Sequence, residues 1–154
     1  MPRIAVFPGS FDPFTKGHEN VICRSRSLFD TIIIAIGNNS QKGSFFTVDQ
    51  RIRMISRLYD QVPGIQVDTY DGLTVDYCRK VGAGYLLRGL RTAADFEYER
   101  AIAQINRKMN PEVETVFLLT IPELTPINSG IVREILRFGG DARPFLPDGM
   151  IIEP

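Results

Sequence analysis

The chain has 154 residues, 44% of them hydrophobic and 23% charged, which predicts one folded domain over residues 1–154 and excludes an intrinsically disordered protein. Its 18 basic residues balance 18 acidic ones, so bulk attraction to nucleic acid or to a membrane surface is not expected. No apolar run has the length of a signal peptide core or a membrane span, and we therefore expect a cytoplasmic protein.

The first apolar run, residues 4–7, predicts a β-strand that ends at Pro8 and Gly9. The only histidine, His18, stands where a helical pattern begins after the following loop. A strand, a glycine-bearing loop and a helix N-terminus direct backbone N–H groups and the positive end of the helix dipole to one place, where an anion is stabilised. An imidazole there could donate to phosphate oxygens, although a lone histidine is more often structural or solvated.

Strand-like and helical patterns alternate along the rest of the chain. Residues 31–36 form a continuous apolar run, typical of a strand covered on both faces, and we expect this strand to be central. Further strands are expected at residues 65–67, 85–87 and 115–120. A first helix is expected after His18, and a second is expected to run from a capping box at residues 47–50 to a stop at residues 63–64. Three more helices are expected over residues 74–81, 93–109 and 130–138. This order predicts an α/β fold, a Rossmann-like, doubly wound five-stranded parallel sheet with flanking helices.

The longest helical pattern, residues 93–109, places several apolar side chains at spacings compatible with a face packed on the core. These are Phe96, Ala101, Ile102, Ile105 and Met109. We therefore expect this helix to cover the sheet with that face.

Polar and charged residues follow the ends of four predicted strands. They are Ser10 and His18 after the first strand, Lys42 after the second, Arg88 and Arg91 after the fourth, and Asn128 and Ser129 after the fifth. Because the carboxyl ends of parallel strands share one edge of a sheet, where ligands bind, we expect one basic, hydroxyl-bearing cleft. A loop lysine or a pair of loop arginines is by itself usually only solvated, so the prediction depends on their convergence.

Two stretches of the sequence resemble known enzymes. Gly9-Ser10-Phe11-Asp12-Pro13 followed by Thr15-Lys16-Gly17-His18 is similar to the signature of the nucleotidylyltransferase superfamily, whose defining tetrapeptide is His/Thr-x-Gly-His. Residues 88–91 and 95–99 resemble the second signature of the bacterial phosphopantetheine adenylyltransferase family, and the resemblance runs from end to end. It implies a step of coenzyme A biosynthesis, the reversible transfer of the adenylyl group of ATP to 4′-phosphopantetheine, giving dephospho-coenzyme A and pyrophosphate.

The resemblance also implies roles for individual residues. His18 and Lys42 would be catalytic; Ser10, Lys42, Thr74 and Arg88 would bind phosphopantetheine; and Ser10, Phe11, His18, Gly89, Leu90, Arg91, Glu99, Leu124, Thr125, Pro126, Ile127, Asn128, Ser129 and Gly130 would bind ATP. The family usually carries Ile-Ser-Ser-Ser/Thr at the head of the last helix, where this chain has Asn128 and Gly130 in two of the positions. We therefore expect Gly130 to offer only its backbone N–H.

The resemblance further implies a homohexamer, feedback inhibition by coenzyme A, and Mg²⁺ bound with ATP. Few carboxylates are expected at the cleft, so the ion would be held mostly by the nucleotide and water, and we predict no permanently bound metal.

The phosphate of the acceptor is already a competent nucleophile, so catalysis reduces to in-line positioning and to neutralising charge on phosphorus, for which His18 and Lys42 are the candidates. The tetrapeptide at residues 15–18 does not select the acceptor, and nicotinate mononucleotide or glycerol phosphate stay as alternatives. Residues 88–99 and the compact length favour the pantetheine branch. A non-catalytic sensor of adenine nucleotides or coenzyme A on the same fold is another alternative, against which the intact tetrapeptide argues.

Overall fold

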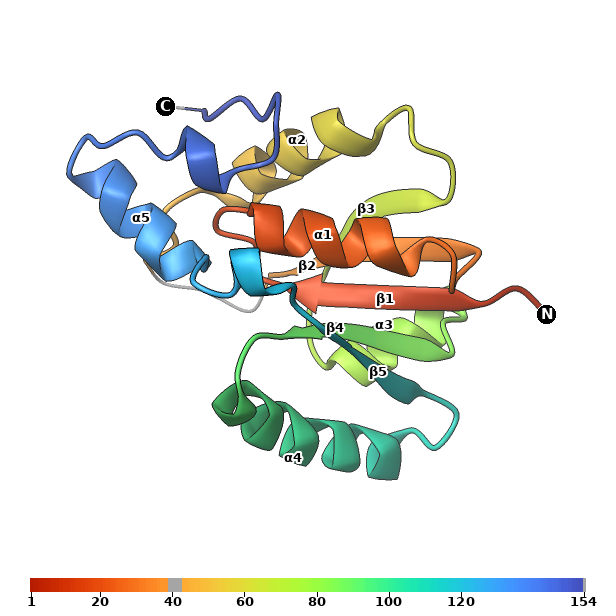
Figure 1. Cartoon of the computed structure of the whole chain (residues 1–154). Coiled ribbons are helices and arrows are strands. Elements are labelled where there is room, and N and C mark those ends of the chain that lie inside the picture. The colour runs from red at the N-terminus through yellow and green to blue at the C-terminus, as the bar shows by residue number, and fades with distance from the viewer. Residues whose placement is uncertain (39–42, 154) are drawn as a thin grey trace.

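The computed structural model of this protein describes residues 1–38 and 43–153. Its centre is a five-stranded sheet in the order β3-β2-β1-β4-β5, in which every neighbouring pair is parallel (Figure 1). The strands are β1 (Ile4–Gly9), β2 (Thr31–Gly37), β3 (Ile65–Tyr70), β4 (Tyr85–Leu90) and β5 (Glu114–Leu119). The Rossmann-like parallel sheet is confirmed, and β2 lies inside it, between β3 and β1, as expected, while β1 is the middle strand. Both strands have neighbours on each side, so their apolar runs look alike in the sequence.

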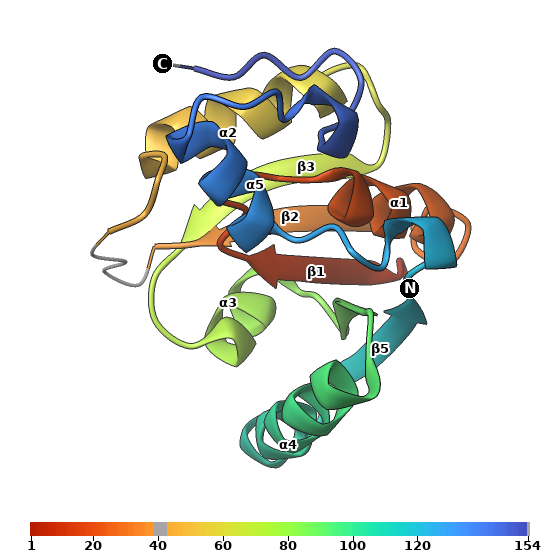
Figure 2. The ribbon, with the colours of Figure 1, turned by 60° about the vertical axis from the view of Figure 1, so that its left-hand side comes forward.

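Helices cover both faces of this sheet. They are α1 (Lys16–Ser25), α2 (Val48–Tyr59), α3 (Thr74–Val81), α4 (Ala93–Met109) and α5 (Ser129–Arg137). In both views α1, α2 and α5 lie on one side of the strands, and α3 and α4 lie on the other (Figures 1 and 2). Successive side chains of the strands point to opposite faces of the sheet. Phe7 and Ile34 pack in the same cluster as residues of α1 and α2, whereas Val6 and Ile33 pack with residues of α3.

Capping residues begin two of the predicted helices, and the capping box expected at 47–50 is one of them. The Thr47 hydroxyl accepts from the backbone N–H of Gln50 at 3.1 Å, and the Gln50 side chain accepts from the backbone N–H of Thr47 at 2.8 Å. Thr92 and Asp95 form the same reciprocal pair at the start of α4. Each pair satisfies backbone donors that the first helical turn leaves unbonded, and so fixes where the helix begins.

The long helix α4 differs from the expectation in its packing. Phe96, Ile102, Ile105 and Met109 are 40%, 37%, 60% and 43% exposed, and the one buried residue of the helix is Glu99. The helix lies at the outer edge of the molecule beside β5 (Figure 2). The prediction that this whole apolar stripe packs on the core of this chain is therefore wrong. The sheet ends at β5, where the ring of Phe96 contacts that of Phe117 with centroids 5.9 Å apart, while Ile105 and Met109 stay exposed.

The segment after α5 folds back over α2 (Figure 1). Leu146 and Ala142 pack against Val132 of α5. The Glu153 carboxylate forms ion pairs with Arg53 and Arg57 of α2, at N–O distances of 2.7 and 3.3 Å. Within residues 1–38 and 43–153, no helix is long and apolar enough to cross a membrane.

Candidate active site

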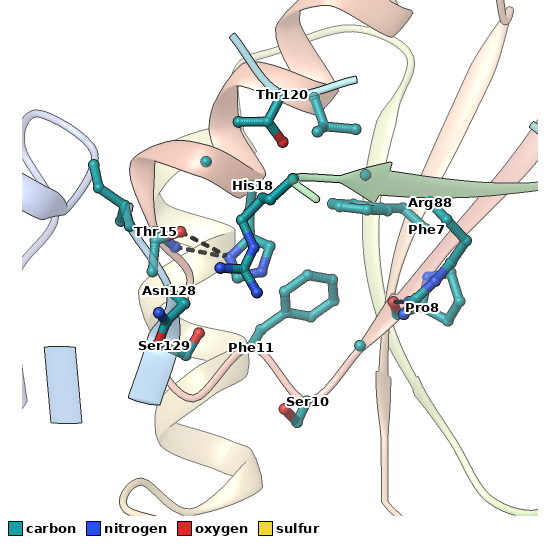
Figure 3. Close-up of a pocket in the computed structure, with 16 residues that line it drawn as sticks. Phe7, Pro8, Ser10, Phe11, Thr15, His18, Arg88, Thr120, Asn128 and Ser129 are labelled. Atoms are coloured by element: carbon teal, nitrogen blue, oxygen red, sulfur yellow. Dashed lines mark hydrogen bonds between the residues drawn. The ribbon is translucent and has the colours of Figure 1, made fainter. Parts of the chain in front are cut away.

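A cavity of about 280 Å³ opens where β1 and β4 end and α1 begins (Figure 3). It brings together residues that the sequence placed at one mouth of the sheet: Ser10, Phe11, His18, Arg88, Gly89, Arg91, Ile127, Asn128 and Ser129. The other residues that line it are Phe7, Pro8, Gly9, Thr15, Gly17, Val21 and Thr120. The convergence of these segments, far apart in the sequence, follows from the parallel order of the strands.

A second cavity of about 240 Å³ adjoins the first and shares Pro8, Gly9 and Arg88 with it. Thr74 and Glu99 line it, together with the more apolar side chains Tyr70, Leu86, Tyr98 and Ile102. Arg88 therefore lies at the boundary between a polar cavity and a mixed one.

Other predicted site residues are placed elsewhere. Leu90, Leu124, Thr125, Pro126 and Gly130 line neither cavity, and Gly130 follows Ser129 in the first turn of α5. Lys42 lies outside the described residues. Their roles stay predictions.

His18 is held by the residue that begins its own helix. Its Nδ1 accepts from the backbone N–H of Thr15 at 2.9 Å and lies 3.2 Å from the Thr15 hydroxyl, as the dashed lines in Figure 3 show. This is the capping-box arrangement, with histidine at the position usually occupied by Glu or Gln. Because a backbone N–H can only donate, Nδ1 must be the unprotonated nitrogen, and a neutral ring carries its proton on Nε2.

Aromatic rings surround this imidazole. The ring centroids of Phe11, Phe14 and Phe7 lie 5.0, 5.3 and 6.2 Å from that of His18. Burial lowers the pKa of His18 to about 3, and the positive charges of Arg88 and Arg91 act in the same direction. The imidazole is thus neutral at pH 7, with its proton on Nε2.

The residue beneath the histidine, Phe11, explains the glycine before it. Phe11 has a φ of 48°, in the left-handed region, and is only 3% exposed. A Cβ atom at Gly9 would lie 2.9 Å from the Phe11 ring, so only glycine fits there. Since the ring is turned into the core, the contact with ATP predicted for Phe11 would come from its backbone.

Two buried charges, which the sequence analysis did not single out, hold the loop after β1. Arg51 is 1% exposed and donates to the carbonyl oxygens of Ser10 at 2.7 Å and Phe46 at 3.2 Å. The Asp12 carboxylate accepts from the backbone N–H groups of Phe45 and Phe46 at 2.7 and 2.8 Å. Burial lowers the pKa of Arg51, an effect that the nearby Asp12 opposes. Asp12 falls inside a recognisable motif, whereas nothing in the sequence around Arg51 distinguishes it from the other arginines of α2.

The N-terminus of α5 faces the cavity with a capped end. Asn128 Oδ1 accepts from the backbone N–H of Ile131 at 2.9 Å and so caps the helix, and the Ser129 hydroxyl donates to the carbonyl of Pro13 at 2.8 Å. A Cβ atom at Gly130 would lie 3.1 Å from Asn128 Oδ1, tighter than an ordinary contact. In the described part of the chain, the backbone N–H groups of Ser129 and Gly130 remain for an outside acceptor.

The two arginines lie on and just after β4. Arg88 is in the strand itself rather than in the loop expected after it, because β4 continues to Leu90. Arg88 contacts Glu99 through Nε and Nη2, and the Pro8 carbonyl through Nη1 at 2.6 Å. The backbone N–H of Arg91 donates to Asp95 at 3.0 Å, and its side chain lies 3.7 Å from the same carboxylate.

Gly89 separates these arginines for a steric reason. A Cβ atom there would lie 3.0 Å from Cγ2 of Val21 in α1, so glycine lets β4 approach the helix that carries His18.

In residues 1–38 and 43–153, no three His, Cys, Asp or Glu side chains gather in a way that would hold a metal ion.

Comparisons with known proteins agree with this geometry. The model of the cytidylyltransferase-like family matches residues 6–135. Among solved structures, a bifunctional NMN adenylyltransferase/ADP ribose pyrophosphatase from Francisella tularensis, complexed with AMP and a manganese ion, has a TM-score of 0.69 at 18% identity. It covers 95% of this chain, and the match spans 44% of that longer protein. Fold and site together therefore define a nucleotidyltransferase-like α/β protein.

Sequence relatives narrow the class. The phosphopantetheine adenylyltransferase of Phocaeicola vulgatus is 50% identical over 151 residues, 98% of this chain and 99% of the relative. That of Cytophaga hutchinsonii is 47% identical over 147 residues, 96% of this chain and 98% of the relative. The chain belongs to the phosphopantetheine adenylyltransferase family.

Proposed function

We propose that this protein transfers the adenylyl group of ATP to the phosphate of 4′-phosphopantetheine, giving dephospho-coenzyme A and pyrophosphate. The observation that carries the proposal is the pair of adjoining cavities that meet at Arg88 next to His18. Two substrates that must bring two phosphates together need two binding spaces with a shared, positively charged boundary. The family relatives support the same reaction.

ATP is proposed to occupy the first cavity, the one that reaches the N-terminus of α5. Arg91 and the free backbone N–H groups at the start of α5 would take its phosphates, because a helix N-terminus favours negative charge. The pantetheine arm is proposed to occupy the second cavity against Leu86 and Ile102, with Thr74 contacting it. The Tyr70 hydroxyl lies 2.8 Å from Thr74 Oγ1 and would help to orient that contact.

The proposed reaction is an in-line displacement. An oxygen of the acceptor's phosphate forms a bond to the α-phosphorus of ATP, and the bond from that phosphorus to the oxygen of pyrophosphate breaks. Negative charge grows on the α-phosphate oxygens in between. The Nε2–H of His18 would donate to that charge, which the Thr15 contact at Nδ1 and the place of His18 in the cavity wall support, and no covalent bond to the protein is required.

The variant His18→Asn tests this role. The shorter amide side chain keeps an acceptor for the Thr15 backbone N–H but lacks the Nε2–H donor. We expect kcat to fall by about two to three decades, the usual loss when a transition-state donor is removed. An unchanged kcat would show that the imidazole does not contribute to the chemistry.

Lys42 and Mg²⁺ complete the proposal. Lys42 would contact the phosphates of both substrates, as the family resemblance implies. Mg²⁺ would travel with ATP and be held by the nucleotide and water, since Glu99 and Asp95, the carboxylates nearest the arginines, are already paired with Arg88 and Arg91.

The first experiment follows pyrophosphate release from ATP and Mg²⁺ with 4′-phosphopantetheine, nicotinate mononucleotide or glycerol phosphate. We expect release with phosphopantetheine alone. Release with another acceptor would keep the site and change the acceptor. ATP or coenzyme A binding with no release from any acceptor would favour a sensor.

Coenzyme A is proposed as a feedback inhibitor for a geometric reason. It combines a phosphopantetheine arm with an adenine nucleotide, so one molecule could occupy both adjoining cavities across Arg88. Inhibition should then be competitive with phosphopantetheine.

A homohexamer is proposed as the assembly, with the exposed apolar stripe of α4 in contact between copies. Ile105 is 60% exposed and Met109 is 43% exposed, more apolar surface than an unpartnered helix usually presents. The variant Ile105→Glu should lower the mass measured by light scattering. An unchanged mass would exclude α4 from the interface.

The cytoplasmic location stays a prediction.

A further inference from the structure

We propose that Tyr70 is a positioning residue for the acceptor. Its hydroxyl donates to Thr74 Oγ1 and so leaves the hydroxyl hydrogen of Thr74 for a carbonyl oxygen of the pantetheine arm. The inference rests on the function proposed above and deepens it at the same site. Neither a motif nor the family resemblance pointed to Tyr70 in the sequence.

Tyr70 and Thr74 meet at the edge of the sheet where the substrates are proposed to bind. Tyr70 is the last residue of β3 and Thr74 is the first residue of α3. Both line the second cavity, and neither lines the first cavity, which contains His18. Tyr70 is 9% exposed, whereas Thr74 is only partly buried. Their hydroxyl oxygens lie 2.8 Å apart, and within residues 1–38 and 43–153 neither hydroxyl has another hydrogen-bond partner.

Burial and acidity give the direction of this hydrogen bond. A phenol is more acidic than an aliphatic hydroxyl and is therefore the better donor. If Thr74 donated instead, the hydrogen of the buried Tyr70 hydroxyl would have no acceptor in the described part of the chain, which is costly. With Tyr70 as the donor, the hydrogen of Thr74 is directed away from Tyr70, into the cavity that Thr74 lines.

Helix α3 does not use the Thr74 hydroxyl as a cap. A threonine at the start of a helix commonly accepts from a backbone N–H of the first turn. The N-cap of α3 is Leu73, which has no side-chain hydrogen bond, and among the described residues Thr74 Oγ1 contacts only Tyr70. The hydroxyl of Thr74 is therefore available to a ligand.

A second hydroxyl contact between β3 and α3 holds the Tyr70 ring. Tyr77, one helical turn after Thr74, donates to Asp68 Oδ2 at 2.6 Å, and Asp68 is on the same face of β3 as Tyr70. The rings of Tyr77 and Tyr70 are stacked, with centroids 4.9 Å apart and 22° between their planes. This stack fixes the direction of the Tyr70 hydroxyl. Tyr77 and Asp68 line neither cavity, so only the Tyr70–Thr74 contact faces a substrate space.

The variant Tyr70→Phe removes the donor and keeps the stacked ring. We expect the KM for phosphopantetheine to rise about three- to tenfold, the effect of losing one neutral hydrogen bond. Both kcat and the Kd for ATP, measured by calorimetry without acceptor, should stay within about twofold, because Tyr70 is not in the cavity of His18.

Tyr77→Phe is the matched control. It removes the other hydroxyl of the same stacked pair, and it also loses a hydrogen bond of a buried side chain. A purely structural effect would appear in both variants. We expect Tyr77→Phe to leave the KM for phosphopantetheine within about twofold, since Tyr77 does not face the cavity.

A double-mutant cycle tests whether Tyr70 acts through Thr74. In a Thr74→Val background, Tyr70→Phe should change the KM for phosphopantetheine by less than about twofold, because the group that it orients is gone. In a Thr74→Ser background, which keeps the hydroxyl, Tyr70→Phe should again raise this KM. If Tyr70→Phe does not fold, Thr74→Val should raise the KM and Thr74→Ser should restore it to within about twofold.

The outcomes separate the two proposals. If the unmodified protein releases no pyrophosphate with phosphopantetheine, the proposed function fails, and this inference fails with it. If the protein does turn over, but Tyr70→Phe raises the KM for phosphopantetheine no more than Tyr77→Phe does, only the inference is overturned. A full effect of Tyr70→Phe in the Thr74→Val background, or equal KM values for Thr74→Val and Thr74→Ser, would also overturn it.

Discussion

His18 gives the most direct test of the site, because it is the only histidine in the chain and its proton can be followed without ambiguity. Its surroundings lower its pKa from 6.5 to about 3, first by burial and then through Arg88 and Arg91. Between those pH values the unfolded chain binds one proton more than the folded protein does. The free energy of unfolding should therefore rise with pH across this window and fall as the solution is acidified below about 6.5.

The magnitude follows from one proton. A single group in this window contributes a slope of about 1.4 kcal/mol per pH unit. Comparison with His18→Asn isolates it, because the carboxylates titrate alike in both proteins. Urea unfolding from pH 6 to 4.5 should show the two stabilities converging toward acid pH with that slope. Parallel curves would refute the neutral imidazole of the folded protein.

Nuclear magnetic resonance gives a second, independent readout. The imidazole signals should show no titration between pH 8 and pH 5, with the proton on Nε2 and not on Nδ1. ATP should then raise the pKa, since its phosphates would offset the positive charges of Arg88 and Arg91, which help to lower it. A midpoint near 6.5 without ligand would contradict the lowered pKa, and a proton on Nδ1 would contradict its bond to Thr15.

Two further predictions concern the loops around the cavity. Arg51→Met should lower the free energy of unfolding by about 2–4 kcal/mol in urea titrations, because the Ser10 and Phe46 carbonyls lose their donor. The control Arg53→Met, on the exposed side of α2, should change the free energy of unfolding by less than about 1 kcal/mol. Equal losses in the two variants would show that the buried contacts of Arg51 are unimportant. Gly130→Ser should tighten ATP binding, measured by calorimetry, by about three- to tenfold, because a hydroxyl joins the backbone donors at the α5 N-terminus. Weaker binding would mean that the new Cβ atom, which would lie 3.1 Å from Asn128 Oδ1, displaces the Asn128 cap.

Much of the fold could be predicted because local signals agree with one another. The capping box at Thr47 and the positive-φ glycine at Gly82, which ends α3, mark helix boundaries by mechanisms that depend only on nearby residues. The end of β4 carries no such signal, because Arg88 and Gly89 do not look like strand residues. They are in the strand because β5 pairs with them as far as Leu90. That pairing is a tertiary effect, invisible in the sequence of β4 alone.

The site was predictable where a residue type itself implies chemistry, and unpredictable where its partner decides the role. His18 and Arg91 were identified from their place after strands, and both line the cavity. Arg51 was missed because an arginine on α2 looks like any solvated charge until the Ser10 carbonyl is seen next to it. The stripe of α4 was assigned to the core because periodicity identifies an apolar face and does not identify what covers it.

The balance of charge in the whole sequence is repeated within the site, and this bears on how the protein can select anions. Arg88 is paired with Glu99, Arg91 is close to Asp95, and Arg51 is bound to backbone carbonyls near Asp12. Such a site has little excess positive field with which to attract any polyanion from a distance. We therefore expect discrimination between anions to come from fixed donor directions, which the partners of these arginines hold.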